Sequence, residues 1–225
     1  CKKSHQAYLE YIRNCAPIEL PSRKHATISV LQWFAKKNCR ISLLEIRLTA
    51  DNPVFKVSNL KVDNFRLLLD SDTTAKSLKL LIDNNMGGKV NEIDISGNQN
   101  RDVMEQLSDC TRNVQTLNFR FPENCLDWLT ADILSRWKLT EIHLYGFGIT
   151  TTVVLLIIST VPDLIRVYFA GNSIDDAAVI AIAEQCPKLE TLYIDSTIIT
   201  VASILALSER GLPLKELDMS YIPNI

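Results

Sequence analysis

The sequence lacks the short motifs that mark secreted and membrane proteins. Its six cysteines are never spaced C-x-x-C, and none of its asparagines lies in an N-x-S/T glycosylation site. Both absences favour a reducing compartment, so we expect a cytoplasmic or nuclear protein. The most apolar run, residues 153–158, is too short to span a bilayer and predicts a buried helix rather than a membrane partner.

The sequence also lacks the residue clusters that an enzyme or a metal site would need. Residues 87–89 (GGK) have neither the upstream glycine nor the following Ser or Thr of a phosphate-binding loop, so they indicate a helix stop. His5, His25 and His143 have no partner at metal-ligand spacing. Cys125 and His143 could meet only through the fold, and nothing orients or activates either one. We therefore expect no enzyme activity, no metal and no cofactor.

Charge is small overall but unevenly distributed. The formal net charge is −2, with +6 over residues 1–40 and −8 over residues 41–225. Duplex nucleic acid needs Lys and Arg clustered on the binding face. The acidic larger segment therefore argues against nucleic acid as the ligand.

A repeat of 25 residues organises most of the chain. Leu139, Leu164, Leu189 and Leu214 are each 25 residues apart, and each opens an apolar L-x-x-L-x-L pattern. Self-similarity at this period is typical of a leucine-rich solenoid with one strand and one helix per turn. We predict an α/β fold, a right-handed leucine-rich-repeat solenoid (horseshoe) with a parallel concave β-sheet and convex helices.

The repeats divide the chain into two segments. Residues 1–40 are expected to form an N-terminal helical segment that enters and caps the array, with helices over residues 4–14 and 26–37. Residues 41–225 hold the repeats, for which we expect eight strands. The last strand pattern has no helix after it, so we expect the array to continue or to be capped beyond residue 225.

One repeat is irregular and leaves its strand register open. Either Val62, Phe65 and Leu67 or Phe65 and Leu68 fill the apolar pattern. A helix is expected next, over residues 73–82, ended by glycines that suit left-handed backbone.

Side chains in the turns predict how each repeat is closed. Thr150, Asp175 and Thr200 precede the expected helices and can cap free N–H groups. Asn98 and Asn172 occupy a turn position where a buried amide can bond the backbone of successive turns. Before the strands, small buried core cysteines are expected at Cys39, Cys110 and Cys186.

The middle of the concave sheet is the place where a binding surface is expected. The residue between the last two pattern positions of each strand points outward there. Large Tyr side chains bind proteins at low entropic cost, but Tyr is also common in exposed strands, so both interpretations stay open. The candidate protein-binding residues are His143, Tyr168, Tyr193, Arg166, Asp195 and Asn118.

Residues 183–194, AEQCPKLETLYI, carry a resemblance to a known family. A helix ends in Cys-Pro-x-Leu at Cys186 and runs into the L-x-x-L-x-L pattern that opens at Leu189. This order resembles the cysteine-containing leucine-rich repeats of F-box proteins, and the resemblance covers residues 40–225. The chain departs from the family where Ala170 and its equivalents replace the second cysteine.

The resemblance implies a protein–protein interaction module, the substrate-recognition part of an SCF-type ubiquitin ligase. The N-terminal CKKSHQAYLEYI also resembles the tail of an F-box. The rest of that F-box would lie upstream of residue 1 and would bind a Skp1–cullin complex. The alternative is an intracellular leucine-rich regulator or sensor that resembles ribonuclease inhibitor, although repeats of that type run longer than 25 residues.

Overall fold

The strands of this protein form one open sheet. The computed structural model describes residues 19–20, 28–38, 40–48, 60–97, 99–120, 127–145, 149–169, 174–194, 198–220 and 222. Within these ranges nine strands follow one another across the sheet in chain order. Every neighbouring pair is parallel. The α/β class and the parallel sheet predicted from the sequence are therefore confirmed.

Helices alternate with the strands along the chain. The strands are β1 (Glu19–Leu20), β2 (Arg40–Leu48), β3 (Lys61–Leu69), β4 (Glu92–Ser96), β5 (Thr116–Arg120), β6 (Glu141–Tyr145), β7 (Arg166–Tyr168), β8 (Thr191–Tyr193) and β9 (Glu216–Asp218). The helices are α2 (Ile28–Lys37), α3 (Lys79–Asp83), the 3-10 helix η1 (Gly87–Lys89), α4 (Arg101–Cys110), α5 (Ala131–Ser135), α6 (Thr151–Thr160), α7 (Asp176–Gln185) and α8 (Val201–Arg210).

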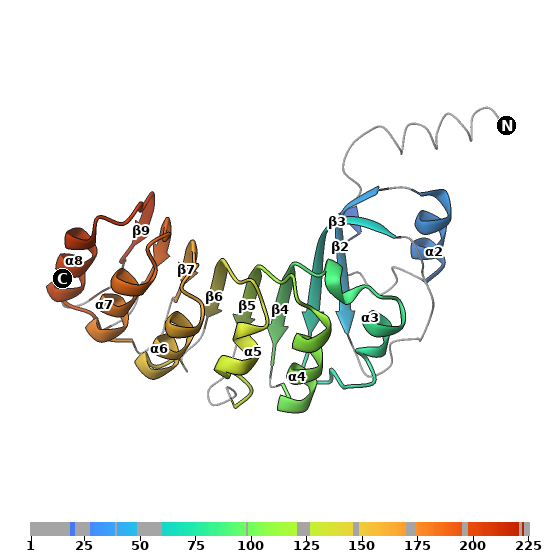
Figure 1. Ribbon diagram of the computed structural model, residues 1–225, viewed down its shortest axis with the longest axis horizontal. Coiled ribbons are helices and arrows are strands. Elements are labelled where there is room, and N and C mark those ends of the chain that lie inside the picture. Colours follow the sequence, from blue (N-terminus) through green and yellow to red (C-terminus); the bar gives the residue numbers. More distant parts are fainter. Residues whose placement is uncertain are drawn as a thin grey trace.

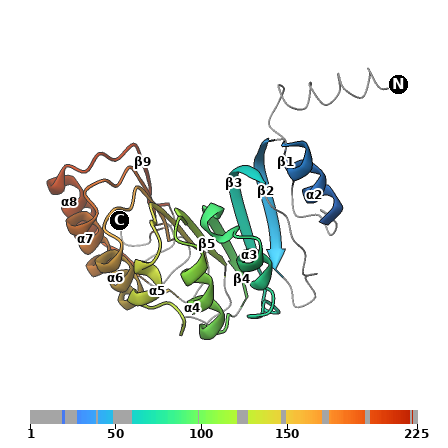
Figure 2. The same ribbon diagram turned by 45° about the vertical axis from the view of Figure 1, so that its right-hand side comes forward.

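The elements stack into a curved, solenoid-like array. Figure 1 shows the strands side by side along the inner side of the curve and α4 to α8 along its outer side. The turned view in Figure 2 places α2 at the end that holds β1 and β2. Each turn from β4 to β8 adds one strand and one helix, so the inner face of the sheet is the surface that the helices leave uncovered.

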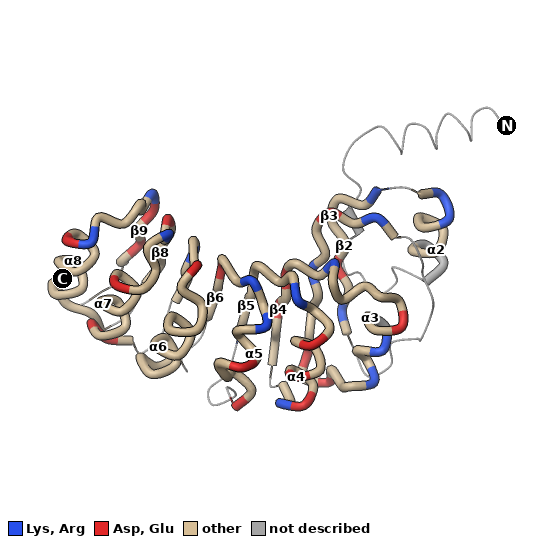
Figure 3. Tube along the Cα trace, in the orientation of Figure 1, with Lys and Arg blue, Asp and Glu red and all other residues tan. Residues whose placement is uncertain are grey.

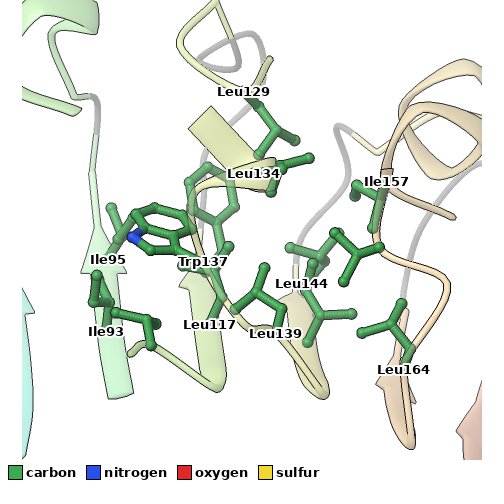
Figure 4. Close-up of a cluster of buried hydrophobic side chains, with 14 of the residues drawn as sticks. Ile93, Ile95, Leu117, Leu129, Leu134, Trp137, Leu139, Leu144, Ile157 and Leu164 are labelled. Atoms are coloured by element: carbon green, nitrogen blue, oxygen red, sulfur yellow. The ribbon is translucent and has the colours of Figure 1, made fainter. Parts of the chain in front are cut away.

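A continuous apolar core lies between the sheet and the helices. Ile93, Leu117 and Ile142 follow one another in the strand register, and all three are fully buried. Figure 4 shows Leu134 of α5 and the nearby Trp137 on the helical side of this core. Complete burial of one such aliphatic side chain contributes roughly 1.5–3 kcal/mol, so each repeat is held by its neighbours.

The register of β3 resolves the alternatives left open by the sequence. Phe65, Leu67 and Leu69 are fully buried, whereas Leu68 is half-buried on the other face. The alternative with Leu68 inside is therefore wrong. The alternative that begins at Val62 names two true core residues but starts the pattern two positions too early.

The helix expected over residues 73–82 is shorter than predicted. α3 begins only at Lys79, and turns precede it. Thr73 Oγ1 donates to the carbonyl oxygen of Leu48 at 2.9 Å and accepts from the backbone N–H of Asp70 at 3.0 Å. A hydroxyl that bonds nearby backbone competes with helix formation, which accounts for the late start.

The glycine pair after α3 has a different role from the one predicted. Asn85, with φ 51°, takes the left-handed position, whereas Gly87 and Gly88 lie in η1. A Cβ on Gly87 would lie 2.1 Å from the carbonyl oxygen of Cys110, but nothing lies within 4 Å of one on Gly88. Gly87 is therefore required by a close backbone approach and not by its handedness.

The predicted helix caps are confirmed at two of three positions. Asp175 accepts from the N–H of Ala177 at 3.1 Å, and Thr200 accepts from the N–H of Ala202 at 3.2 Å. Thr150 occupies the same position before α6 but makes no side-chain cap bond, so that prediction is wrong.

The turn residues give mixed outcomes. Cys186 is fully buried, as predicted, and Cys110 is only half-buried. Cys39, Asn98 and Asn172 lie outside the described residues, so the predicted asparagine ladder stays a prediction.

The N-terminal segment contributes a strand that the sequence did not predict. β1 pairs with β2 through Glu19 and Leu43. α2 falls within the helix expected over residues 26–37, and Asn38, with φ 55°, follows its end. The helix expected over residues 4–14 lies outside the described residues.

Candidate protein-binding surface

Two rows of outward-pointing residues cross the inner face of the sheet. They arise because alternate residues of a strand share a face and the parallel register aligns them from strand to strand. The central row is Arg47, Leu68, Asp94, Asn118, His143, Tyr168, Tyr193 and Asp218. The charged row is Glu45, Arg66, Glu92, Thr116, Glu141, Arg166, Thr191 and Glu216.

Three rings of the central row form an aromatic stack (His143, Tyr168 and Tyr193). The His143 and Tyr168 rings are nearly parallel, with an angle of 9° and centroids 4.0 Å apart. The Tyr168 and Tyr193 centroids are 4.8 Å apart at 26°. Adjacent strands set this spacing, so three flexible side chains become one ordered strip.

Glu141, a residue of the charged row, holds the stack in place through hydrogen bonds. Its Oε1 lies 2.6 Å from His143 Nε2, and its Oε2 accepts from Arg166 Nε at 2.6 Å. Burial opposes ionisation of this carboxyl, but the bonds from Arg166 and His143 hold its pKa below the ordinary value. The carboxylate accepts only, so Nε2 donates, and Nδ1 faces the Tyr145 hydroxyl at 3.0 Å. The imidazole is thereby fixed on both sides.

The two tyrosine hydroxyls stay protonated near neutral pH. Burial, followed by the charge of Glu141, raises the pKa of Tyr168. The charge of Glu216, followed by burial and by Asp218, raises the pKa of Tyr193. The stack therefore presents neutral rings, and the Tyr193 hydroxyl is hydrogen-bonded to Glu216.

Two acidic side chains, Glu216 and Asp218, lie beside the end of the stack at β9. Among the described residues neither Glu216 nor Asp218 forms an ion pair, although Glu190 nearby pairs with Lys215 at 2.8 Å. Asp218 instead accepts from the hydroxyl of Ser220 at 2.6 Å, and this bond lowers the pKa of its carboxyl. Figure 3 shows the acidic residues of β9 at this end of the sheet.

The candidate residues from the sequence fall largely where they were expected. His143, Tyr168 and Tyr193 lie together, and Arg166 borders them in the charged row. Asp195 lies outside the described residues.

Asn118 belongs to the central row next to His143, but its amide donates to Glu92 at 2.6 Å. It therefore already has a partner within the protein.

Sequence reasoning missed three residues of this surface. Glu141, Tyr145 and Glu216 share the face of the stack, and the alternation of strand residues could have identified each of them. Alternation does not show which side chains these residues bond, because hydrogen bonds and ion pairs depend on the distances between side chains on neighbouring strands.

The described residues were compared with the requirements of a metal site and of an activated thiol. No group of three or more His, Cys, Asp or Glu side chains in these ranges could hold a metal ion. Burial raises the pKa of the Cys186 thiol to about 12 and that of Cys110 to about 11, so neither is a thiolate at neutral pH. None of the described helices is long and apolar enough to cross a membrane.

Comparison with known proteins does not supply a family. No protein-family model matches the chain, and no curated protein matches it. The resemblance to F-box repeats therefore depends on the repeat period and on the motif at residues 183–194.

Proposed function

We propose that this chain is a protein-interaction module whose inner sheet face binds a protein partner. The observation that carries the proposal is the aromatic stack, held in place by Glu141 and Arg166. Aromatic side chains carry a large share of binding energy in protein interfaces. Because these rings are already ordered, less conformational entropy is lost when a partner docks on them.

The charge of the same face favours a protein over a nucleic acid. Glu216 and Asp218 lie on it without forming an ion pair among the described residues, and phosphates would be repelled there. No activated nucleophile accompanies the stack in these ranges, so we propose binding alone, without enzyme activity.

A finer proposal follows from the sequence resemblance. We propose that the partner is a substrate and that the chain is the recognition part of an SCF-type ubiquitin ligase, working in the cytoplasm or nucleus. It is supported by the Cys-Pro-x-Leu motif, in which Cys186 is the buried C-cap residue of α7 and Leu189 is fully buried. The alternative is a leucine-rich regulator or sensor without a ligase role.

The test of the binding surface is site-specific photo-cross-linking. A photoreactive amino acid at Arg120, an exposed residue of β5, should cross-link a protein from cell extract. The matched control carries the same group at Glu209 of α8, on the outer side. Equal cross-linking of the same protein from both positions would contradict a partner on the inner face.

The ligase proposal has its own test. Affinity capture with the protein encoded by the full-length reading frame should bring down the Skp1–cullin complex. Capture of a partner without that complex would favour the regulator instead.

A further inference from the structure

A basic hollow lies where β2 and β3 begin. Its volume is about 800 Å³, and its described lining residues are Asn38, Arg40, Lys61, Val62, Asp63 and Lys89. They come from the end of α2, the starts of β2 and β3, and η1. Arg40 and Lys61 are in register on neighbouring strands, and Figure 3 shows Lys and Arg at this end of the sheet. Cations from three successive parts of the fold therefore meet around one hollow.

The carboxylate in this lining neutralises only one of the three cations. Asp63 accepts from Arg40 Nε through both of its oxygens, at 2.6 and 2.9 Å. The exposed Lys61 forms no ion pair among the described residues. Lys89 Nζ donates to the carbonyl oxygen of Leu60, which holds the ammonium group in place without cancelling its charge. The basic hollow thus keeps two uncompensated positive charges.

Lysines before later strands of the same sheet are neutralised by the protein itself. Lys188, which precedes β8, bonds Asp163 at 2.7 Å. Lys215, which precedes β9, bonds Glu190 at 2.8 Å. Lys89 precedes β4 and reaches only a neutral carbonyl. The unmatched charge is therefore a local property of the basic hollow and is not shared by every lysine that precedes a strand.

The shape of the basic hollow adds to the effect of its charge. A concave surface lined by charges of one sign focuses the electric field and attracts oppositely charged groups. Its volume of about 800 Å³ falls in the range of roughly 300–1,000 Å³ that is usual for ligand sites. A short acidic peptide can place separate carboxylates on the two ammonium groups. Duplex nucleic acid needs cations along a whole face, whereas residues 41–225 carry a net charge of −8.

We propose that the basic hollow binds an acidic segment of a protein partner, with Asp or Glu side chains bonded to Lys61 and Lys89. Arg40 stays paired with Asp63 and forms one wall of the site. The basic hollow lies at β2 to β4, whereas the aromatic stack lies on β6 to β8. The inference therefore adds a second binding site and does not rest on the proposed function.

The experiment measures fluorescence anisotropy with the whole chain. The probes are fluorescein-labelled hexaglutamate and its neutral analogue, fluorescein-labelled hexaglutamine. Hexaglutamate should bind about tenfold or more tightly than hexaglutamine, because only its side chains carry charge. Added salt should weaken the binding of hexaglutamate, since exposed charges are screened. Equal binding of the two probes, or binding of hexaglutamate that salt does not change, would overturn the proposal.

Charge-removing variants locate the site. Lys61→Gln combined with Lys89→Gln should weaken hexaglutamate binding by about fivefold or more. The matched control is Lys188→Gln combined with Lys215→Gln, which removes the same charge outside the basic hollow and should bind like the unmodified protein. Lys61→Glu alone changes an exposed side chain without an ion pair among the described residues, so it should weaken the binding without disturbing the fold. An equal loss for the control pair, or no loss for Lys61→Glu, would show that the peptide binds elsewhere.

A third probe separates an acidic peptide from a nucleic acid. A fluorescein-labelled hexathymidine should bind less tightly than hexaglutamate, and tighter binding of hexathymidine would contradict a site for acidic peptides. The cross-linking at Arg120 keeps the two proposals apart. Loss of the hexaglutamate response with intact cross-linking removes only this inference, whereas loss of inner-face cross-linking removes only the proposed function.

Discussion

The two halves of the inner face differ in how they treat charge. β2 and β3 are nine residues long each, and Arg66 of β3 bonds both Glu45 and Glu92 on the strands beside it. β7, β8 and β9 are three residues long each, and from β6 to β8 the central row holds stacked rings in place of charges. The first half pairs acids with arginines inside the protein, whereas the second half presents a row of stacked aromatic rings.

The largest effect is expected from removal of two rings of the stack. Replacing Tyr168 and Tyr193 together by Ala should weaken partner binding by at least about 2 kcal/mol, because aromatic anchors carry much of an interface's energy. Isothermal titration with the cross-linked partner would measure it. The fold should survive, since neither residue belongs to the buried core. Lys76→Ala is the control, and equal binding by the two variants would show that the partner docks elsewhere.

The next effect is expected in the stability of the fold, near the half of the sheet that pairs its acids with arginines. Gly87→Ala forces a Cβ to within 2.1 Å of a backbone oxygen and should cost about 1–3 kcal/mol in the free energy of unfolding. Gly88→Ala, with open space around the added atom, should cost much less. Urea unfolding followed by circular dichroism measures both, and matching midpoints for the two variants would show that the close approach is not needed.

A smaller effect is expected at the helix caps of the second half. Thr200→Ala removes a cap on α8 and a bond to Asp176 and should cost about 1 kcal/mol. Thr150→Ala is the matched change at a position without a side-chain cap bond and should cost less. The comparison uses melting temperatures, and a larger loss for Thr150→Ala would contradict this account of the caps.

The smallest effect concerns the bonds of Glu141 to His143 and Arg166. The pKa of Glu141 is lower in the folded protein, so its contribution is complete above the ordinary Glu value of about 4.3 and is lost as the pH falls through the lower folded value. Arg166 is 46% exposed, so the contribution should stay below about 1 kcal/mol. Unfolding midpoints at pH 7 and pH 3 should differ less for Glu141→Gln than for Glu209→Gln, and an equal difference would exclude a contribution from these bonds.

The sequence predicted the parallel repeats because their apolar spacing is regular from residue 90 onward. Strand alternation also predicts that Tyr168 and Tyr193 share one face of the sheet. It failed at β3, where Leu67, Leu68 and Leu69 are all apolar and alternation cannot show which of them points inward. β1 gave no signal, since a two-residue strand is too short to have a pattern.

The site was less predictable than the fold. The sequence identifies carboxylates but not which of them an arginine reaches, because that depends on side-chain distances between strands. Glu141 and Glu216 occupy equivalent positions in their strands, yet only Glu141 is bonded to an arginine among the described residues. The arginine that bonds Glu141 lies on the following strand, β7, whereas a threonine precedes each of the two glutamates, at Thr116 and Thr191.

The side chains of the central row are evenly spaced. They advance by one strand spacing, about 4.8 Å, per repeat. An extended peptide laid along the row advances about 3.3 Å per residue and drifts out of step at once. One turn of an α-helix advances about 5.4 Å, so a helix can offer one side chain to each of three or four successive repeats before the mismatch reaches about 2 Å. The periodicity of the array therefore matches the turn of a helix better than the step of a strand.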